Sequence, residues 1–320
     1  MTSARLKSLE ICAGAGGLAL GLERAGFDPV LLIDNNEHAC KTLLLNRPQW
    51  DVLQADVMDF DPAEHSQVYD VDLLSGGLPR VKSAATAQRP ATDLEWRLLQ
   101  ASVWLAHSVQ PRAVLLENVH ELVTSPIYGA DRAWIQEYLA DEGYLCSWRV
   151  LNAADFGVPQ NRKQGFLVAM REPHHSKFRW PEPIESTPPT VGETLLESMA
   201  ARGWPGAVGW AARADATGPA IVGGSDKRGG GDLGPTGSKR IWAGLGVDGK
   251  SIADDVPGPG DALDLMPKLT AQQAAKLQAF PDNWAFFGKK TSMYRQIGHS
   301  SPPPVGEAVA RCVADALDAD

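Results

Sequence analysis

"LKSLEICAGAGGLALGLERAGF", residues 6–27, is typical of a strand, a glycine-rich turn and a helix in direct succession. Leu6, Leu9 and Ile11 are typical of a strand, residues 18–25 place apolar side chains at helical spacing, and Gly26 ends the helix. Glycines let a backbone approach a ligand closely, and the free amides at a helix start attract polar or anionic groups. We therefore predict a cofactor-binding loop, made of Cys12, Ala13, Gly14, Gly16 and Gly17.

Two acidic residues follow at the ends of the next predicted strands. Asp34 closes "PVLLID", residues 29–34, about 20 residues after the glycine loop, where a carboxylate can accept hydrogen bonds from a ribose diol. Asp56 closes "WDVLQAD", residues 50–56. The loop lacks the full GxGxxG fingerprint of dinucleotide-binding proteins, so it does not require a pyrophosphate. A nucleoside cofactor such as S-adenosylmethionine fits the same pattern.

Buried apolar runs continue to alternate with helices up to about residue 170, which predicts an α/β fold with a doubly wound, mostly parallel sheet. Ligands of such sheets lie at the carboxyl ends of the strands, where Arg80 and Glu117 also fall. After residue 173 the sequence becomes rich in proline and glycine. We predict one domain from residues 1–175 and 266–320, with residues 176–265 inserted as a smaller domain.

The composition excludes several classes of protein. The 320 residues carry a net charge of −9, so any binding to nucleic acid requires cations gathered on one face. The four cysteines show no metal-binding spacing, and no apolar run is long enough for a membrane span. With no signal peptide apparent, we expect a cytoplasmic protein without metal or membrane partners.

Six segments, in order, resemble the motifs of the cytosine-5 DNA methyltransferase family and extend over nearly the whole chain. They are "EICAGAGGL" (10–18), "SGGLP" (75–79), "LLENV" (115–119), "FGVPQNRKQGF" (156–166), "LTAQQAAKLQAFPDNWAF" (269–286) and "YRQIGHSSPPPVGEAVA" (294–310). The resemblance implies a Rossmann-like methyltransferase fold, S-adenosyl-L-methionine as cofactor, double-stranded DNA as partner, and a target-recognition role for residues 176–265. It also implies a base flipped out of the duplex, because the pocket cannot reach a stacked base.

The family reaction needs a cysteine thiolate that adds to C6 of cytosine, and a glutamate that assists at N3. Glu117 and Arg162 match the family's catalytic motifs. Arg80, however, stands where the family motif Gly-x-Pro-Cys has its nucleophile. A guanidinium stays protonated and only donates hydrogen bonds, so it cannot add to C6. Gln164 and His299 also depart from the family, which commonly has Arg and Asn there.

These departures leave three hypotheses. The first is a protein that binds S-adenosylmethionine and DNA, without methylating C5 by the usual covalent route, and that can support a catalytic paralogue. The second is an active methyltransferase with another nucleophile, such as Cys12 or Ser83, or with a thiol from a partner subunit. In the third, Arg80 stabilises an anionic group during another modification of the base.

DNA contacts are expected from the base pocket, from the segment that follows Arg80 and from the glycine-rich middle of the chain. The predicted residues are Asn118, Gln160, Gln164, Lys82, Arg89, Lys227, Arg228, Lys239 and Arg240. Binding would place the protein at the nucleoid. Restriction–modification, phage defence and regulation are all compatible with the sequence.

Overall fold

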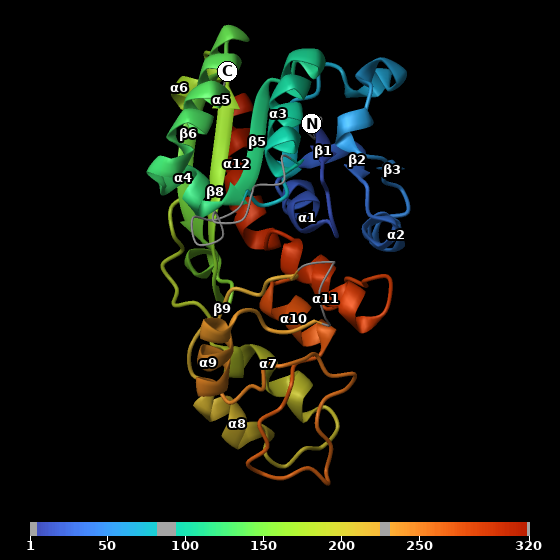
Figure 1. Ribbon diagram of the computed structural model, residues 1–320, viewed down its shortest axis with the longest axis vertical. Helices are drawn as coiled ribbons and strands as arrows, with labels where there is room; N and C mark the ends of the chain where they lie inside the picture. Colours follow the sequence, from blue (N-terminus) through green and yellow to red (C-terminus); the bar gives the residue numbers. More distant parts are fainter. Residues whose placement is uncertain (1–4, 82–93, 225–230, 319–320) are drawn as a thin grey trace. The chain divides into compact units, whose positions relative to one another are not determined.

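The computed structural model describes residues 5–81, 94–224 and 231–318 (Figure 1). The chain divides into two compact units. The first unit comprises residues 1–151, 163–182 and 305–320, and the second comprises residues 152–162 and 183–304.

A seven-stranded sheet in the order β3-β2-β1-β4-β5-β8-β6 forms the centre of the first unit (Figure 1). Its strands are β1 (Leu6–Ile11), β2 (Phe27–Asp34), β3 (Val52–Gln54), β4 (Leu73–Gly77), β5 (Ala113–Val119), β6 (Leu145–Asn152) and β8 (Lys163–Met170). The pairs from β3 to β5 are parallel, whereas β8 runs antiparallel to β5. The predicted mostly parallel α/β sheet is confirmed.

Helices cover both faces of this sheet, as its continuous apolar strands require. On one face, α3 (Leu94–Val109) and α5 (Gly129–Asp141) share an apolar core with the strands, through Val103 and Ile135. On the other face, α12 (Pro303–Asp318) lies behind β5 and β8 in Figure 1. Gly306 of α12 approaches Leu18 of α1 (Gly17–Arg24) closely. The first unit also contains α2 (Glu37–Asn46), α4 (His120–Thr124) and α6 (His174–Lys177).

The second unit is mainly helical. It contains α7 (Val191–Ala200), α8 (Ala207–Arg213), α9 (Thr236–Gly244), α10 (Ala271–Leu277) and α11 (Lys290–His299), with a two-stranded parallel sheet of β7 (Gln160–Asn161) and β9 (Gly218–Pro219). Thr190 and Thr270 each form a capping box that fixes the start of α7 and α10. Its core includes two fully buried tryptophans, Trp210 and Trp242.

The observed units differ from the predicted domains in their boundaries. Residues 266–304, which the sequence grouped with the cofactor domain, belong to the second unit, as do residues 152–162. The physical reason is that α10 packs against both α7 and α11, and that Gln160 and Arg162 are hydrogen-bonded to later parts of that unit. Motif order in a sequence does not reveal such packing.

The described residues contain neither a membrane span nor a metal-binding cluster. None of their helices is long and apolar enough to cross a lipid bilayer. No cluster of three or more His, Cys, Asp or Glu side chains in these ranges could hold a metal ion.

Candidate functional site

The predicted cofactor loop connects β1 to α1 through left-handed backbone conformations, which residues other than glycine rarely adopt. Gly14 and Gly16 have φ values of 54° and 85°, and Cys12 has a φ of 50° although it carries a side chain. The amide of Gly16 donates to the Ala13 carbonyl at 3.0 Å, which closes a tight turn just before the first residue of α1. Nothing lies within 4 Å of the position that a Cβ on Gly14 would take. The loop therefore has open space on that side.

Asp34, at the end of β2, supports this loop directly. Its Oδ2 accepts a hydrogen bond from the Gly14 amide at 2.7 Å, and its Oδ1 accepts one from Asn36 at 2.8 Å. A carboxylate oxygen has room for a second donor, so both oxygens can also accept hydrogen bonds from ligand hydroxyls. The Asp56 carboxylate accepts from the Met58 amide at 2.9 Å and caps the 3-10 helix Val57–Asp59. These groups suit a nucleoside cofactor with a ribose diol.

Glu10 is a buried carboxyl group on β1 that the sequence analysis did not single out. It is 1% exposed, and neither of its oxygens has a hydrogen-bond partner among the described residues. Burial raises its pKa to about 8, the nearby Ala19 amide offsets part of this, and the charge of Asp34 adds to it. A lone glutamate within the apolar run of residues 9–11 was the available signal. Glu10 is paired in register with Ser75 of β4.

The turn after β4, residues 77–81, is held by the neighbouring strand β5. The Leu78 amide donates to the Glu117 carbonyl at 3.2 Å. The buried Asn118 is hydrogen-bonded to the residues on both sides of position 80. Its Oδ1 accepts from the Val81 amide at 3.1 Å, and its Nδ2 donates to the Pro79 carbonyl at 3.3 Å. Arg80 is exposed between these two anchored residues. Asn118, predicted as a DNA contact, thus has a positioning role in the turn.

Gly77, at the end of β4, lies between the cofactor loop and the Glu117 carboxylate. A Cβ on Gly77 would lie 3.8 Å from both the Cys12 carbonyl oxygen and Glu117 Oε2. The Glu117 carboxylate, 5% exposed, therefore lies beside the cofactor loop. The structure thus brings together the cofactor loop, Glu117 and the base of the Arg80 turn, all within the first unit.

None of the four cysteines has the environment of a reactive thiolate, and all four lie in described parts of the chain. Burial raises the pKa of Cys12 to about 12, and the nearby charges of Asp34, Asp56 and Glu10 add to this effect. Burial also raises the pKa of Cys40 to about 11 and that of Cys146 to about 12, and it raises the pKa of Cys312. A nucleophilic cysteine requires the opposite shift.

Gln160 and Arg162 belong to the second unit and connect its segments there. The guanidinium of Arg162 donates to the carbonyls of Ile221 at 2.7 Å and Ser300 at 3.0 Å, and it is 2% exposed. Gln160 donates to Gln278 Oε1 at 2.6 Å and accepts from the Ile221 amide at 2.7 Å. These bonds give both residues a structural role. Their predicted contacts with a base stay predictions.

The remaining predicted residues are distributed over both units. Gln164 is buried on β8 opposite Val119, and His299, at the end of α11, has its Nε2 3.1 Å from the Gly224 carbonyl oxygen. On α9, Lys239 forms an ion pair with Asp232 at 2.6 Å, whereas Arg240 is exposed. Five of the residues lie outside the described ranges, namely Lys82, Ser83, Arg89, Lys227 and Arg228.

The family can now be assigned from comparisons with known proteins. The sequence model of the C-5 cytosine-specific DNA methylase family matches residues 6–207 and 247–314. The chain belongs to this family. Methyltransferases of the family use S-adenosyl-L-methionine as the methyl donor, and their substrate is double-stranded DNA. The predicted family and cofactor are thereby confirmed.

Individual relatives of this DNA methylase cover almost its full length. Type II methyltransferase M.NaeI of Lentzea aerocolonigenes is 45% identical over 317 residues, which are 98% of this chain and 76% of that protein. Type II methyltransferase M.NgoMIV of Neisseria gonorrhoeae is 42% identical over 314 residues, which are 97% of each. The crystal structure of a putative DNA modification methyltransferase encoded within an Escherichia coli prophage aligns with a TM-score of 0.69 at 21% identity, covering 98% of this chain and 99% of that one.

Proposed function

We propose that this member of the DNA methylase family binds S-adenosylmethionine and double-stranded DNA but does not methylate cytosine C5 by the covalent route. The observation that carries the proposal is Arg80, on the anchored turn beside Glu117 where the family motif has its cysteine. A guanidinium cannot add to C6 of the base. The turn itself keeps its hydrogen bonds, so the substitution changes the chemistry and leaves the backbone support in place.

The chain's own cysteines do not supply a substitute nucleophile. Cys12 is the nearest by position, but its pKa of about 12 leaves almost no thiolate at neutral pH. The nearby acidic side chains also disfavour a negative charge on the Cys12 sulfur. These shifts argue against Cys12 as the catalytic nucleophile. A thiol from another subunit could still supply the nucleophile that adds to C6 of cytosine.

The cofactor part of the proposal rests on Asp34, Asp56 and the glycine loop. When bound, S-adenosylmethionine would supply the electrophilic methyl group. The Asp34 carboxylate would accept hydrogen bonds from its ribose hydroxyls, and the open space beside Gly14 would admit the ligand.

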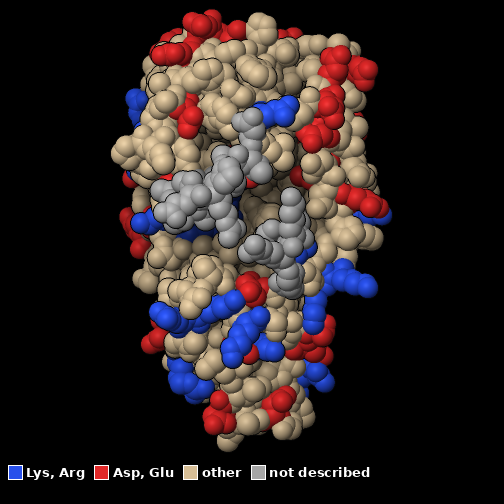
Figure 2. Space-filling view, in the orientation of Figure 1, with Lys and Arg blue, Asp and Glu red and all other residues tan. Residues whose placement is uncertain are grey.

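Binding to DNA by an acidic protein requires an uneven distribution of charge, which the two units have. The second unit contains 13 Lys or Arg and 13 Asp or Glu, so of the 30 and 39 in the whole chain the first unit holds 17 and 26. The whole net charge of −9 therefore belongs to the first unit. On the face in Figure 2, blue side chains are more frequent over the second unit. We propose that Arg240, and Lys239 when released from Asp232, contact DNA phosphates.

Incubation with radiolabelled S-adenosylmethionine and mixed-sequence duplex DNA tests the proposal. We expect no label transfer by the natural protein and transfer by Arg80→Cys, because the variant restores a thiol on the same anchored turn. Arg80→Ser is the matched control, since it is similarly small but lacks the thiol. Arg80→Cys combined with Glu117→Gln should lose most of the regained activity.

Label transfer to DNA by the natural protein alone would contradict the proposal. A catalytic Type II methyltransferase can be added to the same reaction. If label transfer then exceeds the transfer by that enzyme alone, the protein supports a paralogue in restriction–modification. Calorimetry with S-adenosylmethionine is the separate check of the cofactor site, and Asp34→Ala should weaken the binding at least about tenfold.

A further inference from the structure

Three carboxyl groups from three different segments lie near the Cys12 thiol of the cofactor loop. Burial raises the pKa of Cys12 most, and the charges of Asp34, Asp56 and Glu10 add to this increase. These residues come from the end of β2, from the start of the 3-10 helix after β3, and from β1. Carboxylates gathered in this way produce a negative potential. The cofactor loop therefore favours a ligand that carries a positive charge.

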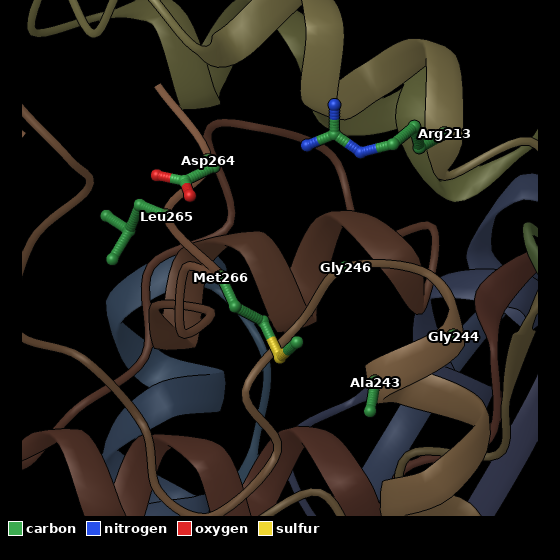
Figure 3. Close-up of a pocket in the computed structure, with 7 residues that line it drawn as sticks. All are labelled: Arg213, Ala243, Gly244, Gly246, Asp264, Leu265 and Met266. Atoms are coloured by element: carbon green, nitrogen blue, oxygen red, sulfur yellow. The ribbon is translucent and has the colours of Figure 1, made fainter. Parts of the chain in front are cut away.

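A hollow of about 270 Å³ in the second unit has no such excess of one charge. It opens at the ends of α8 and α9 (Figure 3). Arg213 and Asp264 both line it, so their formal charges cancel. The other lining residues are uncharged, namely Ala243, Gly244, Gly246, Leu265 and Met266. Asp264 is exposed and thus offers a carboxylate outside the cofactor site for comparison.

Glu10 differs from the other two carboxyl groups near Cys12 in its surroundings. Its neighbours Leu9 and Ile11 belong to the apolar core that the strands share with α3 and α5, so Glu10 projects from the opposite face of β1. On that face it lies near the Ala19 amide, in the first turn of α1. Neither of its oxygens has a hydrogen-bond partner among the described residues, whereas the other two carboxylates accept hydrogen bonds from backbone amides. A charge on Glu10 is therefore the least compensated of the three.

A buried carboxyl group without partners keeps its proton near neutral pH, because water does not solvate its charged form. Burial accordingly raises the pKa of Glu10 to about 8, and the charge of Asp34 adds to the increase. The groups around Glu10 are the Asp34 carboxylate from β2, the Cys12 thiol from the loop, the Ala19 amide from α1 and Ser75 from β4. A cation bound at the loop would act in the opposite direction to Asp34. It would favour the carboxylate of Glu10, and the proton would pass to the solvent.

We propose that Glu10 makes the cofactor site prefer S-adenosylmethionine, which carries a sulfonium charge, over its demethylated form S-adenosylhomocysteine, which does not. This inference rests on the proposed function, because it takes the glycine loop as the cofactor site. The ionised carboxylate attracts the sulfonium, whereas a neutral thioether gains nothing from it. The preference should increase as the pH rises, since binding of the cation then no longer requires Glu10 to lose a proton.

Calorimetric titration of the full chain with each of the two ligands, at pH 6.5 and at pH 8.5, tests the proposal. We expect the ratio of the two affinities to shift about fivefold toward S-adenosylmethionine at the higher pH, because a change of one pKa unit on binding corresponds to a tenfold change in affinity over the full titration. Glu10→Gln cannot ionise, so it should lose this shift and keep the natural affinity for S-adenosylhomocysteine at pH 6.5. Asp264→Asn is the matched control, since it removes a carboxylate from the second unit, and it should keep the natural shift.

The protons released on binding give a second measurement, obtained by repeating the titrations at pH 8 in phosphate and in Tris, whose enthalpies of ionisation differ. The natural protein should release more protons than Glu10→Gln when it binds S-adenosylmethionine. Ionisation of the ligand itself cancels in this comparison, because both proteins receive the same ligand. Equal proton release, or an affinity ratio with the same pH dependence in both proteins, would overturn the inference and leave the proposed cofactor site in place. Failure of the natural protein to bind either ligand would overturn the cofactor site itself, and the inference with it.

Discussion

Two turns in the first unit leave neighbouring strands of the same sheet and differ in what determines their residues. The loop after β1 is built from backbone in the left-handed region at Cys12, Gly14 and Gly16. The turn after β4 is held by Asn118, which bonds backbone atoms of Pro79 and Val81, and the Arg80 side chain between them is exposed. The fold requires particular residues in the first turn and accepts almost any side chain at position 80.

This difference changes how the pattern of retained motifs is interpreted. Retained glycines and Asp34 would be expected even without selection for cofactor binding, because Asp34 also holds the loop through the Gly14 amide. At position 80, by contrast, the exposed side chain has no structural role that would keep the cysteine expected from the family motif. The presence of the cofactor motifs is therefore evidence that the fold is maintained. Whether the protein still binds the cofactor has to be measured directly.

The largest expected effect concerns Glu10, on the strands that support both turns. Its pKa is about 8 in the folded protein and near 4.5 when unfolded, so its stabilising contribution is complete below pH 4.5 and is lost as the pH rises through 8. We expect Glu10→Gln to remove this loss, which is up to about 5 kcal/mol for a shift from 4.5 to about 8 at 1.4 kcal/mol per pKa unit. Urea denaturation at pH 5 and pH 9 measures it. Equal pH dependence in both proteins would contradict the assignment.

Asn118→Ala should have the next largest effect, because it removes the side-chain hydrogen bonds that hold the turn after β4. The buried side chain makes hydrogen bonds to Pro79, Val81 and Val119, and its loss leaves their backbone groups without these partners. We expect a loss of about 2–3 kcal/mol in the free energy of unfolding. In an Arg80→Cys background the same change should also lower methyl transfer. A fully active double variant would argue against a positioning role.

Gly16→Ala should be destabilising by about 1–2 kcal/mol, because Gly16 has a φ of 85° and is buried at the start of α1. It should also weaken binding of S-adenosylmethionine by distorting the loop. Calorimetry and thermal denaturation measure the two effects. Gly26→Ala, at a φ of 102° beyond the far end of α1, is the control: it should be destabilising while leaving cofactor affinity unchanged.

Arg80→Ala should have the smallest effect, within about 0.5 kcal/mol, as for exposed side chains without structural partners. Thermal denaturation checks this value. A clearly destabilised Arg80→Ala would mean that the fold has come to depend on the guanidinium, and the contrast between the two turns would fail.

Much of the first unit could be predicted from the sequence, because parallel strands and their helices give strong local patterns. The strand–loop–helix of residues 6–27 and Asp34 at the end of β2 are examples, whereas Asp56, predicted to close a strand, lies two residues after the end of β3. The boundary of the second unit was less accessible. It depends on Gln160 and Arg162 bonding to residues far along the chain, such as Ile221 and Gln278, and no local pattern encodes those partners.

The sequence by itself determined the family, the sheet and the identity of residue 80, since motif order and residue type are properties of the chain. Only the tertiary structure decided what surrounds those residues. Burial and nearby carboxylates keep the Cys12 thiol protonated, and Asn118 supports the turn that presents Arg80. Desolvation and charge act through space, so residues distant in sequence set the chemistry of each site.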